Sequence, residues 1–364
     1  MSDPYLSEQI ITYLGNKRAL LSFIETALVS VKEKTGRDRL DIADMFSGSG
    51  IVSRFFKAHA NKLYSNDLED YCNTINRCYL ANWSSVDTDE LLRHYRKIKQ
   101  RLDDGPLIKG FISDMYAPAD DDDIRPGERV FYTARNAAYI DTARTLMEDI
   151  PEPYKTFLLA PLLYEASVHT NTGGVFKGYY KNSRTGVGRF GGDGQNALSR
   201  IMSDIELKMP VFGKYECDVE IYQEDANLLA SKLPRLDLAY LDPPYNQHPY
   251  GSNYFMLNLI NSYIRPENVS TVSGIPKDWN RSDYNKKPAA KDAMFDLCSR
   301  FDARFLLISF NSEGFIDKDE MILMLEDLGE VSVFDRQYNT FRASRNLAGR
   351  NIHVREYLYL VEKR

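Results

Sequence analysis

The chain has no long apolar runs and is poor in histidine, tryptophan and cysteine. Its 364 residues include only 5 histidines, 2 tryptophans and 4 cysteines. No apolar run is long enough to span a bilayer, so we expect no membrane-spanning segment. The first residues, Met-Ser-Asp-Pro-Tyr, contain neither a basic region nor an apolar stretch. Nothing there marks the chain for export, and we expect a cytoplasmic protein.

The few cysteines show neither metal-ligand spacing nor disulfide density. They are Cys72, Cys78, Cys217 and Cys298. This usage fits reduced thiols, and we predict no metal site. An excess of basic residues is also missing, because the formal net charge is -6 at pH 7. Any contact with nucleic acid must therefore come from local basic patches.

One short stretch organises the rest of the sequence. An apolar run from Leu236 to Leu241 breaks at Asp242, which is followed by two prolines and Tyr245. Proline fixes φ and cannot donate to a strand ladder, so we expect a buried strand that ends in a rigid turn. Asp242 would then lie at the carboxyl end of a strand, where open α/β sheets bind their ligands.

This turn suits methylation of an exocyclic amine. The amino nitrogen of adenine is a poor nucleophile because its lone pair is delocalised into the ring. Two acceptors for its hydrogens would draw that density back, and Asp242 and the Pro243 carbonyl can provide them. Tyr245 offers a flat face for a base, and Pro244 helps to hold the three groups still. A purely structural turn is the alternative interpretation.

A nucleotide-binding pattern precedes the turn. Residues 40–50 predict a strand that runs into a turn containing Ser47, Gly48 and Gly50, followed by an apolar helix. The glycines let the backbone approach a bound molecule closely. The third glycine of a dinucleotide fingerprint and the Gly-Lys-Ser/Thr of a phosphate loop are missing, which disfavours NAD and ATP.

Two further acids stand at predicted strand ends. Asp67 ends a short strand some twenty residues after the glycine turn, where an acid usually takes both ribose hydroxyls. Asp225 ends a strand that begins near Val219. It can accept from the adenine amino group of a cofactor, cap the helix that follows, or do both.

Near the start of the chain, Tyr13, Gly15 and Lys17 lie at a predicted junction between a loop and a helix. Lys17 is a candidate partner for a ligand carboxylate, and Tyr13 can pack on an aromatic or sulfonium group. An exposed lysine on an amphipathic helix is the alternative.

Residues 171–192 alternate glycines with aromatic residues and carry four basic side chains, which are Lys177, Lys181, Arg184 and Arg189. A flexible basic loop with planar side chains can follow a nucleic-acid backbone and slip beside bases. We therefore predict DNA contact, with a glycine-rich hairpin over the cofactor cleft as the alternative. Residues 265–291 are polar and rich in proline, and we interpret them as a mobile lid or a second DNA-contacting segment.

The end of the chain predicts a two-stranded antiparallel unit, formed by residues 331–338 and 352–361. Arg342, Arg345 and Arg350 lie between the two strands without an acid among them. Phosphate contact and a solvated hairpin tip are equally compatible with this pattern.

Together these motifs resemble an alpha-class DNA adenine-N6 methyltransferase of the restriction-modification type. The resemblance lies in order as well as content, because the element around Lys17 precedes the glycine turn, then Asp67, a long insertion and the Asp-Pro-Pro-Tyr turn. None of the cysteines follows a proline, as a cytosine-ring methyltransferase would require.

The resemblance implies an α/β fold with a Rossmann-like S-adenosylmethionine-dependent methyltransferase sheet and a C-terminal antiparallel hairpin. Residues 1–82 and 218–364 would form the two parts of the catalytic domain. Residues 83–217 would be an inserted target-recognition region of helices and loops.

The resemblance also implies S-adenosylmethionine as cofactor and an adenine flipped out of duplex DNA, with Asp242, Pro243, Pro244 and Tyr245 at the reacting amine. The implied cofactor-binding residues are Tyr13, Gly15, Lys17, Asp44, Phe46, Ser47, Gly48, Gly50, Asp67, Asp225 and Ala226. A cognate restriction endonuclease is a candidate partner, and the protein could be a monomer or a homodimer. Alternatives are an RNA amino-methyltransferase acting on adenine or guanine, and a non-catalytic subunit that binds S-adenosylmethionine or nucleic acid.

Overall fold

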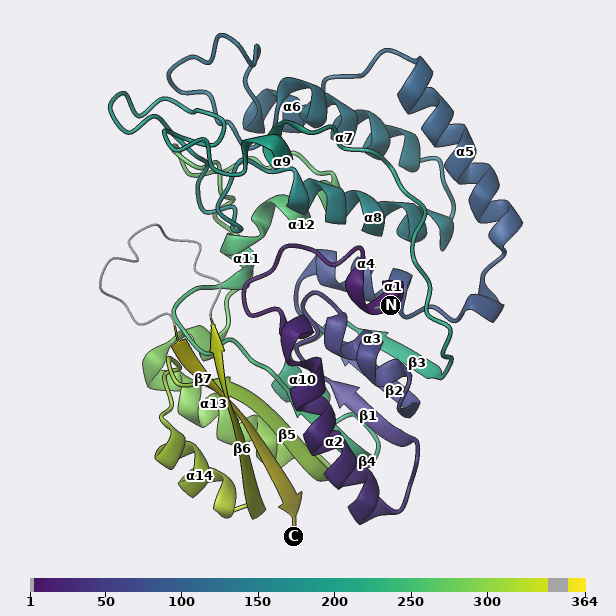
Figure 1. Ribbon diagram of the computed structural model, residues 1–364, viewed down its shortest axis with the longest axis vertical. Coiled ribbons are helices and arrows are strands. Elements are labelled where there is room, and N and C mark those ends of the chain that lie inside the picture. Colours follow the sequence, from purple (N-terminus) through teal and green to yellow (C-terminus); the bar gives the residue numbers. More distant parts are fainter. Residues whose placement is uncertain (1–2, 340–352) are drawn as a thin grey trace.

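The computed structural model describes residues 3–339 and 353–364, so Arg342, Arg345 and Arg350 lie outside the described residues. A seven-stranded sheet occupies one part of the molecule and a layer of helices the other (Figure 1). The strands are β1 (Leu40–Asp44), β2 (Ala60–Asn66), β3 (Asp218–Tyr222), β4 (Leu236–Leu241), β5 (Ala303–Asn311), β6 (Gly329–Asn339) and β7 (His353–Lys363).

The strand order is β3-β2-β1-β4-β5-β7-β6. Strands β1 to β5 pair in parallel, whereas β7 runs antiparallel to both β5 and β6. The predicted α/β methyltransferase sheet is therefore confirmed, and the predicted C-terminal antiparallel unit is the pair β6 and β7. The topology switches direction between β1 and β4, and ligands of open α/β sheets bind at such a point.

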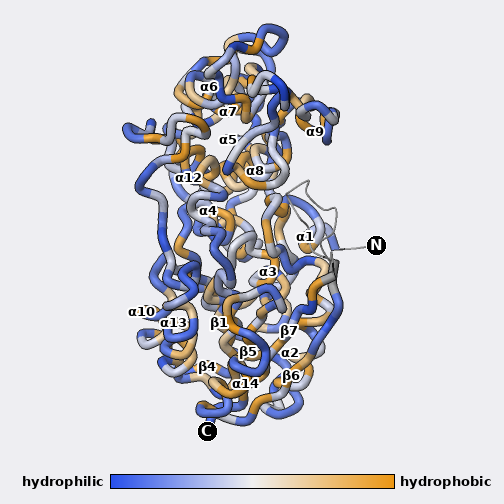
Figure 2. The backbone as a smooth tube through the Cα atoms, turned by 90° about the vertical axis from the view of Figure 1, so that its left-hand side faces the viewer, coloured by the Kyte–Doolittle hydropathy of each residue, from blue (hydrophilic) through white to orange (hydrophobic). Residues whose placement is uncertain are grey.

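Helices cover both faces of the sheet because both faces are apolar. Alternate strand residues such as Ile42 and Leu238 pack with α2 (Leu21–Thr35) and α3 (Ile51–Lys57). Their neighbours, such as Ala43 and Ala239, pack on the other side with α10 (Ala226–Ala230), α13 (Lys287–Arg300) and α14 (Lys318–Glu326). Figure 2 shows the sheet between these two layers. This burial explains the apolar runs at residues 238–241 of β4 and 305–308 of β5.

The helical layer forms a separate core at the carboxyl edge of the sheet. Its elements are α4 (Asp70–Tyr79), α5 (Thr88–Asp104), α6 (Phe111–Tyr116), α7 (Ala134–Met147), α8 (Tyr154–Val168), α9 (Leu198–Met202), α11 (Tyr250–Asn253) and α12 (Phe255–Ser262). Both α4 and α12 lie outside the predicted insertion, yet they pack against α8 from inside it. The helical layer is thus assembled from three separate stretches of the chain.

Short elements complete the description: α1 (Pro4–Ser7), η1 (Lys17–Leu20), η2 (Trp83–Ser85) and η3 (Asp283–Asn285). Lys17 begins η1, as the predicted junction between loop and helix requires. Across the described residues, no helix has both the length and the apolar character needed to cross a membrane.

Candidate active site

The site lies at the carboxyl ends of β1 and β4, where the topology switches. Tyr240 of β4 pairs with Asp44 of β1, so Asp242 emerges from the sheet beside the turn that follows β1. Met45 continues this pairing, because its N–H donates to the Tyr240 carbonyl over 3.2 Å. The glycine turn and the Asp-Pro-Pro-Tyr turn, which are separated by almost 200 residues in the chain, are therefore adjacent in space.

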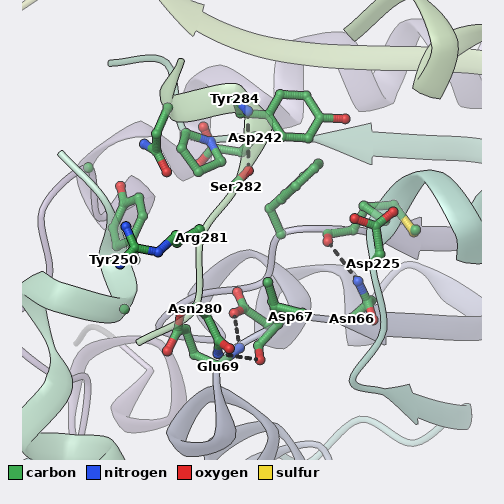
Figure 3. A pocket seen from close by; sticks show the side chains of 18 of the residues that line it. Asn66, Asp67, Glu69, Asp225, Asp242, Tyr250, Asn280, Arg281, Ser282 and Tyr284 are labelled. Atoms are coloured by element: carbon green, nitrogen blue, oxygen red, sulfur yellow. Dashed lines mark hydrogen bonds between the residues drawn. The ribbon is translucent and has the colours of Figure 1, made fainter. Parts of the chain in front are cut away.

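A cavity opens at this edge and holds about 770 Å³ of space free of atoms, including its mouth. Figure 3 shows Asp242 and Tyr284 at one side of the cavity, with Asp67 and Glu69 opposite. Eight of the predicted site residues line it, namely Tyr13, Gly15, Phe46, Asp67, Asp225, Ala226, Asp242 and Pro244.

The glycine turn shapes the cavity without lining it. Gly48 has φ +51°, and a Cβ there would lie 2.8 Å from Cε1 of Tyr13. Gly50 has φ +75°, and its Cβ would lie 2.8 Å from Oδ1 of Asn76. A side chain at either position would therefore displace its neighbour as well as strain the backbone. The Ser47 N–H donates to the Asn66 carbonyl and so ties this turn to the end of β2.

Asp67 and Asp225 occupy strand ends on the far side of the cavity. Asp67 accepts from the N–H groups of Gly48 at 2.8 Å and Glu69 at 3.0 Å. Burial raises its pKa, and these two hydrogen bonds oppose the rise. Asp225 caps α10 by accepting from the N–H groups of Asn227 and Leu228. Both carboxylates line the cavity, so capping and ligand binding remain compatible.

Tyr13 belongs to an aromatic stack that fixes one wall of the cavity. Its ring lies 4.9 Å from that of Tyr250 and 4.7 Å from that of Tyr254. Leu14 is held between the same two tyrosines, because its N–H donates to the Tyr254 hydroxyl and its carbonyl accepts from the Tyr250 hydroxyl. The segment preceding η1 is thereby bound to the helices that follow the catalytic turn.

Lys17 points at Asp242 and does not line the cavity. Its Nζ lies 3.1 Å from Asp242 Oδ1 and 2.8 Å from Glu356 Oε1, and the side chain is only 4% exposed. Burial alone would lower the pKa of Lys17, but Asp242 and Glu356 raise it well above its usual value. The lysine is therefore charged and fully engaged by two acids.

Asp242 stays partly accessible, with 17% of its side chain exposed. Burial raises its pKa to about 6, which Lys17 opposes and Glu356 reinforces. The group is thus mainly ionised at neutral pH. Pro243 follows it, and no described residue donates a hydrogen bond to the Pro243 carbonyl. The ring of Tyr245 packs edge-on against Phe310, and burial raises the pKa of its hydroxyl to about 12.

The cavity is strongly acidic. Five carboxylates line it, from Asp67, Glu69, Glu224, Asp225 and Asp242, and Arg281 is the one basic side chain among its described lining residues. Behind them Asp44 is fully buried, and its Oδ1 has no hydrogen-bond partner within the described chain. Burial raises the pKa of Asp44 to about 7. This environment favours a cationic ligand and disfavours polyphosphates.

Residues 280–285 form a strap that crosses the cavity (Figure 3), and they belong to the segment 265–291 for which the sequence predicts a mobile lid or a second DNA-contacting segment. Asn280 donates to the Leu68 carbonyl at one end, and Asn285 donates to the Asn246 carbonyl at the other. The ring of Tyr284 meets Phe46 edge-on at 5.3 Å. Asn66, Glu69, Glu224, Tyr250 and Gly251 are further lining residues that the motifs did not indicate.

The basic hairpin at residues 171–192 lies beside the catalytic turn. The Phe176 N–H donates to the Asn253 carbonyl at 2.7 Å, which attaches the hairpin to α11. Lys181 covers the ring of Tyr179, and Arg189 pairs with Asp193 at 3.4 Å. The sequence indicated no acid before Asp193, and the structure uses that acid as the partner of Arg189. Arg184 is exposed and has no acidic partner among the described residues.

Some predicted site residues contribute from behind the cavity wall. Those outside its lining are Lys17, Asp44, Ser47, Gly48, Gly50, Pro243 and Tyr245. Among the described residues, no group of three or more histidine, cysteine or acidic side chains is arranged to hold a metal ion.

Comparisons with known proteins agree with this geometry. Residues 13–322 match the family model of the D12 class N6 adenine-specific DNA methyltransferases. The chain is 28% identical to the type II methyltransferase M.NlaIII of Neisseria lactamica, over 97% of this chain and 99% of that protein. It is 29% identical to the type II methyltransferase M.CviAII of Paramecium bursaria Chlorella virus 1, over 96% of this chain and 98% of that protein. The chain therefore belongs to the D12 class of N6 adenine-specific DNA methyltransferases.

Proposed function

We propose that this protein transfers a methyl group from S-adenosylmethionine to the N6 amino group of an adenine at specific sites in duplex DNA, with the adenine flipped out of the helix. The observation that carries the proposal is the position of Asp242, which lines an acidic cavity at the start of a turn that contains two prolines.

The charged and apolar residues that line the cavity support S-adenosylmethionine as the cofactor. The lining acids suit its sulfonium and ammonium groups, and Asp67 at the end of β2 suits the ribose hydroxyls. Phe46, Ala226 and Tyr284 offer apolar contact for the adenine ring, next to the carboxylate of Asp225. Arg281 is the candidate partner of the ligand carboxylate, because Lys17 is already engaged by two acids.

When bound, the cofactor supplies an electrophilic methyl group on sulfur. Asp242 and the Pro243 carbonyl would accept the two hydrogens of the target amine, which orients its nitrogen lone pair towards that methyl group. The target nitrogen would become positively charged as it takes up the methyl group that the cofactor gives up. Asp242 stabilises this charge and can accept the proton that the methylated amine then releases. Tyr245 would hold the face of the flipped base.

DNA would approach from the side of the basic hairpin. Partial burial lowers the pKa of His248, which lies just after the turn. The nearby charge of Lys177 lowers this pKa further, so Lys177 lies close to the turn. A cation beside the entrance to the turn can hold the phosphates that flank a flipped nucleotide. We include Lys177, Lys181, Arg184 and Arg189 in this interface. We also assign target recognition to residues 83–217. A cognate restriction endonuclease is the partner that we propose in the cell.

Long-read sequencing of DNA from cells that express the chain tests this function. We expect N6-methyladenine in one short recurring sequence, and no such signal with Asp242→Ala. Unmodified DNA, accompanied by transfer of labelled methyl groups to RNA in extracts, would contradict the assigned substrate. Absence of transfer to any nucleic acid by a protein that binds S-adenosylmethionine would favour a non-catalytic subunit.

A further inference from the structure

A buried chain of polar side chains lies behind Asp242. The Ser309 hydroxyl on β5 donates to Glu356 Oε1 on β7 over 3.1 Å, and the same oxygen lies 2.8 Å from Lys17 Nζ. Lys17 continues to Asp242 Oδ1 over 3.1 Å. Ser309 is 1% exposed and Glu356 3%. Four side chains from four different segments therefore form one connected path that ends at the turn.

Glu356 stands at a position where the strand pattern calls for an apolar residue. Val354, Leu358 and Leu360 point to the same face of β7 because strand side chains alternate, and all three are buried. A carboxylate among them carries a large desolvation penalty unless it is paired. Lys17 and Ser309 are its partners. Only Lys17 is charged, so the negative charge of Glu356 is compensated only when Lys17 is present.

We propose that Glu356 is a positioning residue for methyl transfer, which acts by holding and partly neutralising Lys17 so that the charge of Asp242 stays available to the target amine. This inference rests on the proposed function. Without Glu356, Asp242 would be the only acid that pairs with the ammonium group of Lys17 among the described residues. The carboxylate would then be a weaker acceptor for the amine, and the site would lose one negative charge in a region of low dielectric.

Other groups around Asp242 set the background for this effect. Lys17 faces it from η1 and Glu356 from β7, while Asp44 on β1 interacts with it electrostatically. The hydroxyls of Tyr240, Tyr245 and Tyr250 also lie within its electrostatic reach. Burial, the largest influence, and Glu356 raise the pKa of Asp242, whereas Lys17 lowers it. Each charge that is removed therefore shifts this pKa in a known direction.

The decisive experiment measures single-turnover methyl transfer to duplex DNA as a function of pH. For Glu356→Gln we expect a rate lower by about 10- to 100-fold, below the loss typical of removing a group that contacts the reacting atoms. The acidic limb of the profile should move to lower pH, because a carboxylate that raises the pKa of Asp242 is gone. Affinity for S-adenosylhomocysteine should stay unchanged, because Glu356 does not line the cavity.

A double variant gives the opposite sign. Lys17→Met combined with Glu356→Gln removes both neighbours, and the loss of Lys17 has the larger effect on Asp242. The acidic limb should then move to higher pH than in the wild type. A purely structural role for Glu356 would leave the acidic limb of Glu356→Gln at its wild-type position. Compared with Lys17→Met alone, the double variant should have its acidic limb at lower pH, and this comparison provides the test if Glu356→Gln does not fold.

Glu362→Gln is the matched control. Glu362 lies on the same strand and pairs with Lys34 at 2.7 Å and Arg304 at 3.0 Å, away from the turn. We expect it to leave the rate and the pH profile unchanged. A wild-type rate and profile in Glu356→Gln, or an acidic limb that moves upward, would overturn the inference. Failure of the wild-type protein to methylate DNA would instead overturn the proposed function.

Discussion

The catalytic edge of the sheet and the basic hairpin at residues 171–192 hold their charges in opposite ways. At the edge, Lys17 and Glu356 form an ion pair, and the side chain of each is only 4% exposed. In the hairpin, Arg184 is exposed without an acidic partner among the described residues, and Arg189 has only a long pair with Asp193. Buried charges are screened little and act strongly on their neighbours, whereas exposed charges are screened by water and salt and act weakly, in a salt-dependent way. We therefore expect the edge to determine the chemical step and the hairpin to determine DNA affinity.

The largest effect should come from Asp242→Ala. Loss of the carboxylate removes an acceptor for the amine and the nearest negative charge, so methyl transfer should fall by on the order of 1000-fold or more. Calorimetry should still detect S-adenosylhomocysteine, because the acids at β2 and α10 remain. Asp237→Ala, at the opposite end of β4, is the control and should retain activity. Substantial transfer by Asp242→Ala would show that the edge does not carry the chemistry.

Neutralising the hairpin tests the other half of the comparison. Replacing Lys177, Lys181, Arg184 and Arg189 with glutamine should weaken binding to duplex DNA by about 10- to 100-fold at moderate salt. The slope of log affinity against log salt should become shallower by up to about 0.9 for each lost phosphate contact.

The control for net charge replaces four exposed basic residues outside residues 83–217 with glutamine, namely Arg37, Arg39, Lys291 and Arg300. Within the hairpin, Arg184 should contribute more than Arg189, whose partner Asp193 already offsets its charge. An unchanged slope in the fourfold variant would locate the DNA interface elsewhere.

Arg281→Gln should sharpen the assignment of the cofactor end of the edge. A charge-assisted contact to a carboxylate is worth enough to weaken S-adenosylhomocysteine binding by about 10-fold or more. Binding of 5′-methylthioadenosine, which has no carboxylate, should change little. Lys277→Gln, four residues earlier and outside the cavity lining, is the control. Equal losses for both ligands would show that Arg281 does not recognise the carboxylate.

The smallest effect should concern stability. Burial raises the pKa of Asp44 from 3.8 to about 7, so the folded chain favours the neutral carboxyl. The contribution of this group to the free energy of unfolding is therefore present below about pH 4 and is lost as pH rises through 7. Asp44→Asn cannot ionise, and its stability should fall between pH 6 and 7 by about 1 kcal/mol less than that of the wild type.

Denaturant unfolding of the ligand-free protein at the two pH values measures this difference. Asp41→Asn is the control and should follow the wild type, because Asp41 lies near the start of β1 and Asp44 at its end. Parallel pH dependence in all three proteins would mean that Asp44 is already ionised in the fold.

Patterns local in the sequence predicted the sheet and the glycine turn well, because apolar runs and turn residues determine them directly. The strand ending in Asp242 and the acid Asp67 appear where strand length and turn chemistry place them. Pairing across distant segments was not predictable. The motifs assigned Lys17 to a ligand carboxylate, yet in the fold it meets Asp242 and Glu356, and no local rule links positions 17 and 356.

One signal was nevertheless present. Glu356 interrupts an alternating apolar strand, which indicates a buried acid that needs a partner. The polar sequence of residues 265–291 predicts a lid or a DNA-contacting segment. The contacts of the strap to Leu68 and Asn246 had no signal, because they are made largely through backbone carbonyls. Polar, proline-rich sequence indicates a loop but not what the loop covers.

The ammonium behind the catalytic turn comes from the beginning of the chain, and the acid that balances it comes from the last strand, which inserts between β5 and β6. During synthesis, the Asp-Pro-Pro-Tyr turn leaves the ribosome more than a hundred residues before Glu356 does. Until β7 docks, Lys17 cannot form its ion pair with Glu356. The ion pairs behind Asp242 can therefore be completed only after the strand that carries Glu356 has been synthesised and has docked.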